Sequence, residues 1–236
     1  MSLITAVYVP TGIVISGDSR TTGTLSQQVA QPGAQDPNAA VTVQTPIVLS
    51  DSAHKVFLVF SRFGIGTFGA AIVNDMPIAH YAETFQTAQE GHQPGSTQEC
   101  ANALLRYFRG LTPMPQTSFL VGGYDGTEPW VLEVNVVNDS TRRWNVVEGT
   151  NQVTYGVVRA GDTAIVNRLL SQPQFNPSFQ AMNLQDAVNY SRHLIRTTID
   201  QMKYEPRFPT VGGPIDTLVL TPEGARFLLR KELTCS

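Results

Sequence analysis

Cysteine is scarce in this sequence, which limits both disulfides and thiol ligands. Only two cysteines occur among 236 residues, Cys100 within a predicted helix and Cys235 next to the last residue. Two thiols so placed do not predict a structural disulfide, and they are typical of a reducing compartment. We therefore expect a cytoplasmic protein.

Charge is low as well. Charged residues make up 15% of the chain, and the formal net charge is −3. Lys and Arg form no cluster that would attract a phosphate backbone, so we expect no nucleic-acid partner. So few charges on a folded chain are typical of surfaces that partner proteins cover.

Long hydrophobic runs are also missing. None approaches the roughly 20 apolar residues that are needed to span a bilayer. The N-terminal segment MSLITAVYVPTG has no basic residue and is interrupted by Pro10 and Gly12, so it predicts a strand and a turn, not a signal peptide. We expect no association with a membrane.

Patterns for metals and cofactors are lacking too. The histidines at positions 54, 80, 92 and 193 share no short ligand spacing, and with two distant cysteines they predict no zinc site. No G-x-S-x-G motif occurs. Gly64-Ile-Gly66-Thr-Phe-Gly69 matches the dinucleotide pattern G-x-G-x-x-G, but a second helix follows where a parallel strand would be required. We interpret these glycines as serving a tight turn and close packing, and we expect no cofactor and no metal.

Short β-branched runs are what the chain does contain, and they mark the predicted strands. Residues 3–9 and 13–17 flank Pro10-Thr11-Gly12 and predict a hairpin, and 55–60 with 64–69 predict a second one. Between the hairpins, residues 21–45 are mostly Thr, Gly, Ser, Gln, Ala, Pro and Asn. This composition predicts a polar insertion. The strand pattern resumes at 41–43 and again at 47–49.

Four predicted helices fall into two pairs. The pairs are separated by a second β block at 117–158, and two more strands follow the last helix. Grouped helices argue against a doubly wound parallel sheet and favour an α+β fold of two antiparallel sheets with a helix pair outside each. With neither repeat nor linker, we expect a single domain, 1–236. The remaining predicted elements are helices at 76–88, 97–109, 163–171 and 184–203 and strands at 215–221 and 225–231.

Ser2 is the candidate nucleophile. Its small side chain permits removal of Met1, which would place a hydroxyl and a free α-amine on one residue. An α-amine with a pKa of about 7.7–8.0 is suited to act as a general base near neutral pH. Such a site also needs a cation, a carboxylate that holds the cation, and a backbone N–H for the oxyanion; Lys55, Asp18 and Gly69 are the candidates. If Met1 is retained, the Ser2 nitrogen is an amide and cannot act as a base.

Several segments resemble the β-type subunits of proteasomes. Ser2, the strand at Gly12-Ile-Val-Ile and the triplet Asp18-Ser-Arg20 match the N-terminal pattern of these subunits, and the steps from Ser2 to Asp18 and from Lys55 to Gly69 equal the family's intervals. Later segments, Leu120-Val-Gly-Gly-Tyr-Asp-Gly and Gly212-Gly-Pro-Ile-Asp-Thr, resemble the family at matching places. The likeness covers nearly the whole chain.

The resemblance implies the fold and activity of the N-terminal nucleophile (Ntn) hydrolases. The implied fold is a four-layer αββα sandwich of two antiparallel sheets flanked by helix pairs. The implied activity is cleavage of peptide or protein substrates, with catalytic residues Ser2, Asp18, Lys55 and Gly69. Family members form rings or stacked arrays, so a homo-oligomer is implied, and an ATPase unfoldase is a candidate partner.

The chain also departs from the family. A serine expected near the nucleophile's amine is replaced by Ala160, and an aspartate and a second serine are replaced by the segment 208–211. Thr210, Asp162 and Ser19 are candidates to take over. The segment between Arg20 and Lys55 is longer than is usual, and it could narrow specificity or contact a neighbouring subunit.

Other interpretations stay open. The chain could be a non-catalytic scaffold subunit, or an Ntn amidase or acyl transferase that acts on another amide. Thr5 is a weaker candidate nucleophile, because four residues would have to be removed and its step to Asp18 is too short.

Overall fold

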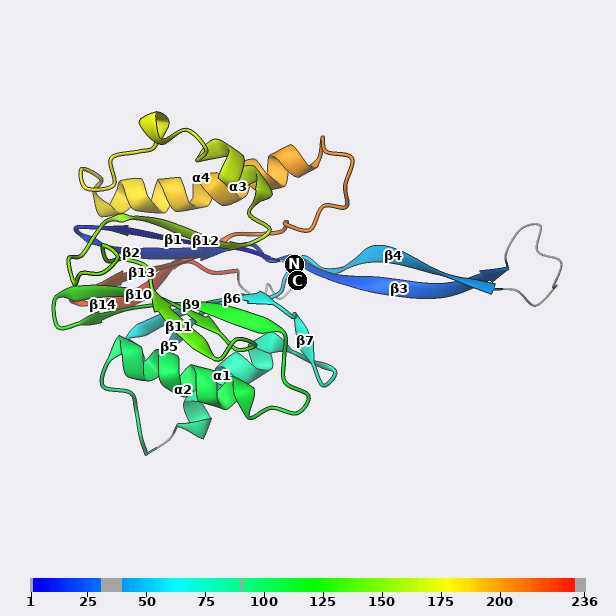
Figure 1. Ribbon diagram of the computed structural model, residues 1–236, viewed down its shortest axis with the longest axis horizontal. Coiled ribbons are helices and arrows are strands. Elements are labelled where there is room, and N and C mark those ends of the chain that lie inside the picture. The colour runs from blue at the N-terminus through cyan, green and yellow to red at the C-terminus, as the bar shows by residue number, and fades with distance from the viewer. Residues whose placement is uncertain (1, 31–39, 90, 232–236) are drawn as a thin grey trace.

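Two five-stranded antiparallel sheets lie face to face in the computed structural model, which describes residues 2–30, 40–89 and 91–231 (Figure 1). The first sheet has the strand order β12-β1-β2-β13-β14. Its central hairpin confirms the first predicted one, because β1 and β2 pair around the turn at Pro10 and Thr11. The strands are β1 (Leu3–Val9), β2 (Gly12–Gly17), β12 (Gly156–Gly161), β13 (Asp216–Thr221) and β14 (Gly224–Leu229).

The second sheet has the strand order β11-β10-β9-β6-β5. It contains the second predicted hairpin, with Val56 opposite Gly66, and its β9 pairs with β6 although 47 residues lie between them, from 70 to 116. The strands are β5 (Val56–Val59), β6 (Phe63–Gly69), β9 (Thr117–Asp125), β10 (Glu128–Asn135) and β11 (Ser140–Arg143).

Close approach of the two sheets depends on glycines in β6. A Cβ added at Gly66 would come within 2.5 Å of Ile4 Cγ2, and one at Gly64 within 2.7 Å of Leu218 Cδ2. The G-x-G-x-x-G pattern therefore lies in a strand and serves packing of sheet on sheet, where a side chain would push the layers apart. Around it, Ile4, Ile15, Leu120 and others form the core between the sheets.

Helices lie against the outer faces of the sheets. The 19-residue α4 (Leu184–Met202) packs on β1 and β2, and a capping box formed by Asn183 and Asp186 fixes its start. On the other side, α2 (Thr97–Arg109) packs on β9 and β10; Ser96 caps it by accepting from the Glu99 N–H. Also present are α1 (Ile78–Ala88), α3 (Ala164–Leu169) and the 3₁₀ turn η1 (Pro173–Phe175).

Two further strand pairs lie outside the stacked sheets. β3 (Thr21–Ala30) and β4 (Ala40–Ser50) form a long two-stranded ribbon that extends away from the body (Figure 1). β7 (Ile72–Val73) and β8 (Met76–Pro77) form a small hairpin, which is why the helix predicted at 76–88 begins only at Ile78. The predicted polar insertion at 21–45 is thus largely strand, with residues 31–39 outside the described part.

The predicted four-layer αββα sandwich is wrong for this chain. The molecule is mostly β, with 41% strand and 24% helix, and its described residues form 14 strands in four antiparallel sheets and only four α-helices. The prediction gave the helices too much weight, since α3 spans six residues and α1 eleven. It also treated the strand-forming segment 21–30 as part of a polar insertion and placed residues 76–77 in a helix. None of the described helices is long and apolar enough to cross a membrane.

Candidate active site

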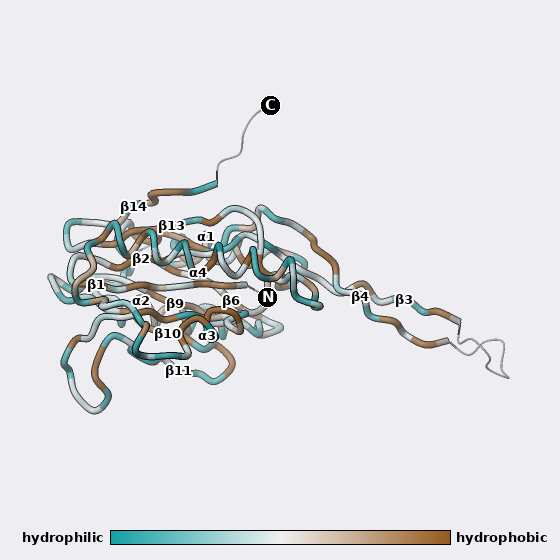
Figure 2. Tube along the Cα trace, turned by 90° about the horizontal axis from the view of Figure 1, so that it is seen from above, coloured by the Kyte–Doolittle hydropathy of each residue, from teal (hydrophilic) through white to brown (hydrophobic). Residues whose placement is uncertain are grey.

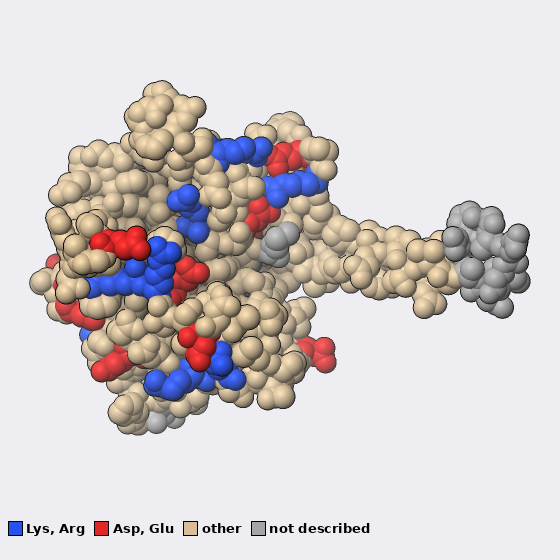
Figure 3. Space-filling view, in the orientation of Figure 1, with Lys and Arg blue, Asp and Glu red and all other residues tan. Residues whose placement is uncertain are grey.

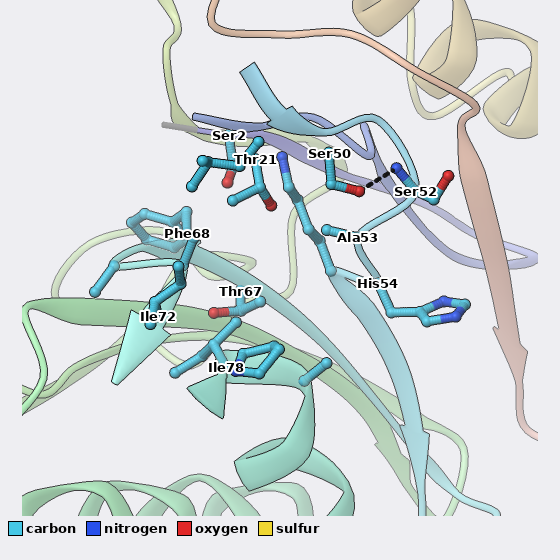
Figure 4. A pocket seen from close by; sticks show the side chains of 16 residues that line it. Ser2, Thr21, Ser50, Ser52, Ala53, His54, Thr67, Phe68, Ile72 and Ile78 are labelled. Carbon is cyan, nitrogen blue, oxygen red and sulfur yellow. Dashed lines mark hydrogen bonds between the residues drawn. The ribbon is translucent and has the colours of Figure 1, made fainter. Parts of the chain in front are cut away.

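A cavity of about 370 Å³ opens at the start of β1, beside the root of the ribbon. Its wall is mostly apolar, and its polar side chains include those of Ser2, Thr21 and Lys55. In Figure 4, Ser2 and Thr21 lie next to each other, on the opposite side of the cavity from Ile78. The cavity therefore joins a candidate nucleophile, a cation and an apolar pocket.

Asp18 organises the polar end of this cavity. It follows β2 directly, is 1% exposed, and accepts four hydrogen bonds. Lys55 Nζ and Leu3 N donate to Oδ1 at 2.8 and 2.9 Å, while Arg20 N and Gly212 N donate to Oδ2 at 3.1 and 3.0 Å. A buried carboxylate is stable only when its charge and lone pairs are met in this way. Asp18 thus fixes four chain segments around one ion pair.

Lys55 is the buried partner of Asp18. It precedes β5, is 3% exposed, and its ammonium also donates to the Arg20 carbonyl at 2.5 Å. Burial lowers the pKa of Lys55 below its usual value, and the neighbouring Asp18 carboxylate offsets part of that change. The structure brings the predicted cation and carboxylate together.

Ser2 precedes Leu3, whose N–H binds the carboxylate of this ion pair. It is 5% exposed and lines the cavity, and its carbonyl accepts from Asp162 N at 2.7 Å. Leu3, the next residue, donates its N–H to the same Asp18 oxygen that Lys55 contacts. The backbone of residue 2 is therefore held on both sides. Met1, whose removal the predicted chemistry requires, lies outside the described residues.

Gly69 ends β6 and is exposed, with φ at +105°, a conformation that favours glycine. Its neighbours Phe68 and Ala70 line the cavity. Thr67 N donates to Lys55 O at 2.8 Å, and N–H groups two residues apart along a strand point to the same side. The Gly69 N–H therefore points away from β9, toward the side of the strand that carries Lys55.

Asp162 and Thr210, predicted as replacements for missing family residues, form a pair. Thr210 Oγ1 donates to Asp162 Oδ2 at 2.5 Å, and Arg207 donates to the same oxygen at 2.7 Å. Burial alone would raise the pKa of Asp162. The two hydrogen bonds, the charge of Arg207 and a hydrogen bond from the Ala164 backbone together outweigh burial and hold the pKa below its usual value. Because Asp162 N binds the Ser2 carbonyl, the pair supports the backbone of the nucleophile.

Thr5 is not placed to react with a substrate. It is fully buried in the middle of β1, and its hydroxyl lies 2.8 Å from Ser191 Oγ of α4. Its alternative role as nucleophile has no support in this geometry.

Ser19, the third predicted replacement, belongs to a polar cluster on the far side of Asp18. Lys231 Nζ donates to Ser19 Oγ at 2.6 Å and also to the Asp216 carboxylate, which lies 3.7 Å from His54 Nδ1. Burial lowers the pKa of His54, and the charge of Lys231 lowers it further. Sequence reasoning did not find Lys231, because it belongs to no local motif and its contact with Ser19 spans nearly the whole chain. Asp216 lies in the family-like segment that begins at Gly212, but its contact with Lys231 was not foreseen.

Gly212 has a similar long-range role. Its N–H binds Asp18, and a Cβ at this position would lie 2.5 Å from Arg20 Cζ. Arg20 in turn forms a two-pronged ion pair with Asp51, at 2.6 and 2.8 Å. The glycine pair at 212–213 was noticed in the sequence as a resemblance, without its contact to Asp18.

No group of three or more His, Cys, Asp or Glu side chains is arranged to hold a metal ion within the described ranges. The comparisons with known proteins give no family: no family model matches the sequence, and no curated protein is significantly similar to it. The functional assignment therefore depends on the geometry of this site.

Proposed function

We propose that this protein is an N-terminal nucleophile hydrolase of the proteasome-like kind, which cleaves peptide bonds with Ser2 once Met1 is removed. One observation carries the proposal. Asp18 Oδ1 binds both the buried Lys55 ammonium and the N–H of Leu3, so a cation is held beside the start of the chain at the wall of a cavity that Ser2 lines.

Acylation would use the Ser2 residue for two tasks. Its α-amine takes the hydroxyl proton, Oγ attacks the carbonyl carbon of the substrate, and the Gly69 N–H donates to the oxyanion. The amine then passes its proton to the leaving nitrogen as the C–N bond breaks. The products are a free amine and an ester on Ser2.

Deacylation reverses these roles with water. The α-amine accepts a proton from a water molecule, which attacks the ester carbonyl. The proton returns to Ser2 Oγ as the C–O bond breaks, and a carboxylic acid leaves. The reaction consumes one water and needs no further reactant.

Lys55 would keep the base neutral. A fixed cation near an amine disfavours the protonated form of that amine, so more of it is free to accept a proton at neutral pH. Asp18 holds the ammonium in place, and burial keeps the interaction from being screened.

The cavity favours an apolar substrate side chain. Ile72, Pro77, Ile78 and Ala79 line the end away from Ser2. A peptide with a medium-sized apolar residue before the cleaved bond would place that residue there. We also infer a cytoplasmic location, supported by the free, buried thiol of Cys100.

The test is intact mass followed by labelling with an electrophile directed at serine or threonine. We expect the purified protein to lack Met1 and to gain one label on Ser2. Ser2→Ala should abolish labelling and lower peptide turnover by about a thousandfold or more, while Ser2→Thr, which keeps a hydroxyl, should retain both. Labelling that persists in Ser2→Ala would refute the proposal.

Lys55 needs a matched pair of variants, because removing one member of a buried ion pair destabilises a protein by about 3–5 kcal/mol. We expect Lys55→Met to lose turnover, and Asp18→Asn/Lys55→Met to lose it equally while leaving no charge buried. Circular dichroism checks the fold of both. Turnover that survives in the folded double variant would remove the ion pair from the mechanism.

The same mass measurement addresses the other interpretations. A mass that includes Met1, with no label, would indicate a scaffold subunit. A labelled protein that transfers the acyl group to added amines but does not hydrolyse peptides would indicate an acyl transferase.

A further inference from the structure

The ribbon of β3 and β4 carries no charged residue in its described part, 21–30 and 40–50. It extends from the body as an uncharged arm (Figures 1 and 3). The strands pair from Thr21 opposite Ser50 to Ala30 opposite Ala40, with one extra residue, Leu49, near the root. We call this segment the arm.

The arm has one apolar face. Residues directly opposite in an antiparallel pair point to the same side, and so do residues two apart along a strand. Leu25, opposite Thr45, therefore shares a face with Val43, opposite Gln27. The remaining large apolar side chains of this face are Val29, Val41, Ile47 and Leu49.

The other face is mostly polar. Ser26 lies opposite Gln44, and Gln28 lies opposite Thr42; Thr22 and Thr24 are on the same side. Apolar residues on this face, such as Pro46 and Val48, are close to the root. Hydropathy accordingly alternates along both strands in Figure 2.

The apolar face is uncovered in a single copy of the chain. Leu25, Val29, Val41, Val43 and Leu49 are between 44% and 49% exposed. A lone two-stranded ribbon is only marginally stable in water, because it has no layer against which to bury a face. An amphipathic arm of this length therefore needs a permanent cover.

The chemistry of the arm limits what can cover it. Membrane-surface segments combine apolar residues with Lys, Arg, Trp or Tyr, and none of these occurs in the described strands of the arm. A charged partner surface would have to be desolvated without compensation. The cover must be apolar and constantly present, as a second copy of this chain is.

The area indicates how two copies would meet. Strands of ten residues give a face roughly 33 Å long and 10 Å wide, or about 300 Å². Two arms packed face to face would bury about 600 Å² in total, whereas two arms that each lie on the body of the other copy would bury about 1,200 Å². Stable protein–protein interfaces bury at least about 1,200 Å² of total surface.

We propose that two copies of the chain exchange arms, each packing its apolar face on the body of the other. Because Leu49 belongs both to the apolar face and to the lining of the Ser2 cavity, the partner's body lies next to the cavity entrance. The exchange is symmetric, with the same contact made twice.

The test compares two double variants by sedimentation velocity over a range of protein concentrations. Leu25→Glu/Val43→Glu places two carboxylates on the apolar face. Ser26→Glu/Thr42→Glu places two carboxylates in the same diagonal relation on the polar face, so charge and arm geometry are matched. Wild type and the polar-face variant should sediment as dimers or larger assemblies of dimers.

The dimer of the apolar-face variant should have a dissociation constant about ten-thousandfold higher or more, because the symmetric exchange buries four carboxylates and each weakens binding by at least about tenfold. Circular dichroism should show that all three proteins are folded. A monomeric wild type would overturn the proposal, and so would equal dissociation of the two variants. Wild-type protein that stays monomeric and binds lipid vesicles through the apolar face would instead identify a membrane surface.

Discussion

The buried ion pair of Asp18 and Lys55 lies at one end of the cavity, and the rest of the cavity wall is largely apolar. Asp18 and Lys55 supply charge at the end where Ser2 lies, and Ile72 and Ile78 supply apolar contact at the other. This separation gives the two ends different tasks. The polar end would control protonation, and the apolar end would select the substrate side chain.

Ile72→Glu tests selection at the apolar end. Ile72 is 48% exposed, so the substitution leaves the core intact, but it brings a negative charge to the cavity wall. We expect kcat/KM for peptides with an apolar residue before the cleaved bond to fall about tenfold, and peptides with Lys or Arg there to gain. Met76→Glu is the control, because Met76 lies on the same small hairpin and does not line the cavity. An unchanged preference would show that the pocket does not bind this side chain.

Asp162 gives a prediction for pH. Its pKa is lowered in the folded state, so its contribution to stability is fully present above about pH 4 and is lost as the pH falls through the folded value. Asp162→Asn should therefore lower the free energy of unfolding at pH 7. Below pH 4 the free energy of unfolding of this variant should fall less steeply with pH than that of the wild type, as measured by urea denaturation. Asp200→Asn, at an exposed ion pair, should change little. If the free energy of unfolding of Asp162→Asn falls below pH 4 as steeply as that of the wild type, this role of Asp162 is contradicted.

The sequence predicted some of the residues that meet at this cavity and missed others for a physical reason. Asp18 follows the predicted strand 13–17 and Lys55 begins the predicted strand 55–60, and the steps from Ser2 to Asp18 and from Lys55 to Gly69 resemble those of a known family. Gly212 and Lys231 contact the same region from residues near the other end of the chain. The spacing of residues within a local motif does not predict which distant loop will fold against Asp18.

Individual elements were predicted where burial imposes a period. β1 and β2 are fully buried runs of β-branched residues, and α4 has both a capping box and a stripe of buried residues. The first strand of the arm was missed, and the second was seen only as the short runs 41–43 and 47–49, because their alternation is between small polar and apolar residues, without a core to strengthen it. Strand order within each sheet could not be read from periodicity at all.

The contact between the two sheets can be tested at Gly66. A methyl group at this position would meet Ile4 Cγ2 at 2.5 Å, so Gly66→Ala should lower the free energy of unfolding by about 1–3 kcal/mol. Gly156→Ala in β12 is the matched control, since its nearest neighbour is Tyr8 Oη at 3.3 Å, the end of a long side chain. Equal effects of the two substitutions in urea denaturation would show that the sheets have room to adjust.

The whole molecule is a β-rich body with an arm attached beside its candidate site. The body explains why the α+β prediction was wrong, since most ordered residues outside the loops lie in strands. The arm adds a little to the shortage of charge noted in the sequence, because its described strands carry only uncharged side chains.

Association should appear in the thermal stability of the whole molecule. A folded dimer that unfolds to separate chains becomes more stable as concentration rises. We expect the Tm of the wild type to increase by roughly 2–4 °C for each tenfold rise in concentration. The Tm of Leu25→Glu/Val43→Glu should not depend on concentration. A wild-type Tm that is constant over a hundredfold range would contradict arm exchange.

The four hydrogen bonds to Asp18 have a consequence for biosynthesis. Apart from Arg20, which is two residues away, its partners lie 15, 37 and 194 residues away along the chain, at Leu3, Lys55 and Gly212. A growing polypeptide that has emerged only as far as β9 possesses the acid and the lysine but lacks the glycine that secures them. The contacts around this ion pair are therefore complete only after residue 212 has been synthesised, and a shorter chain holds an Asp18 carboxylate that lacks one of its donors.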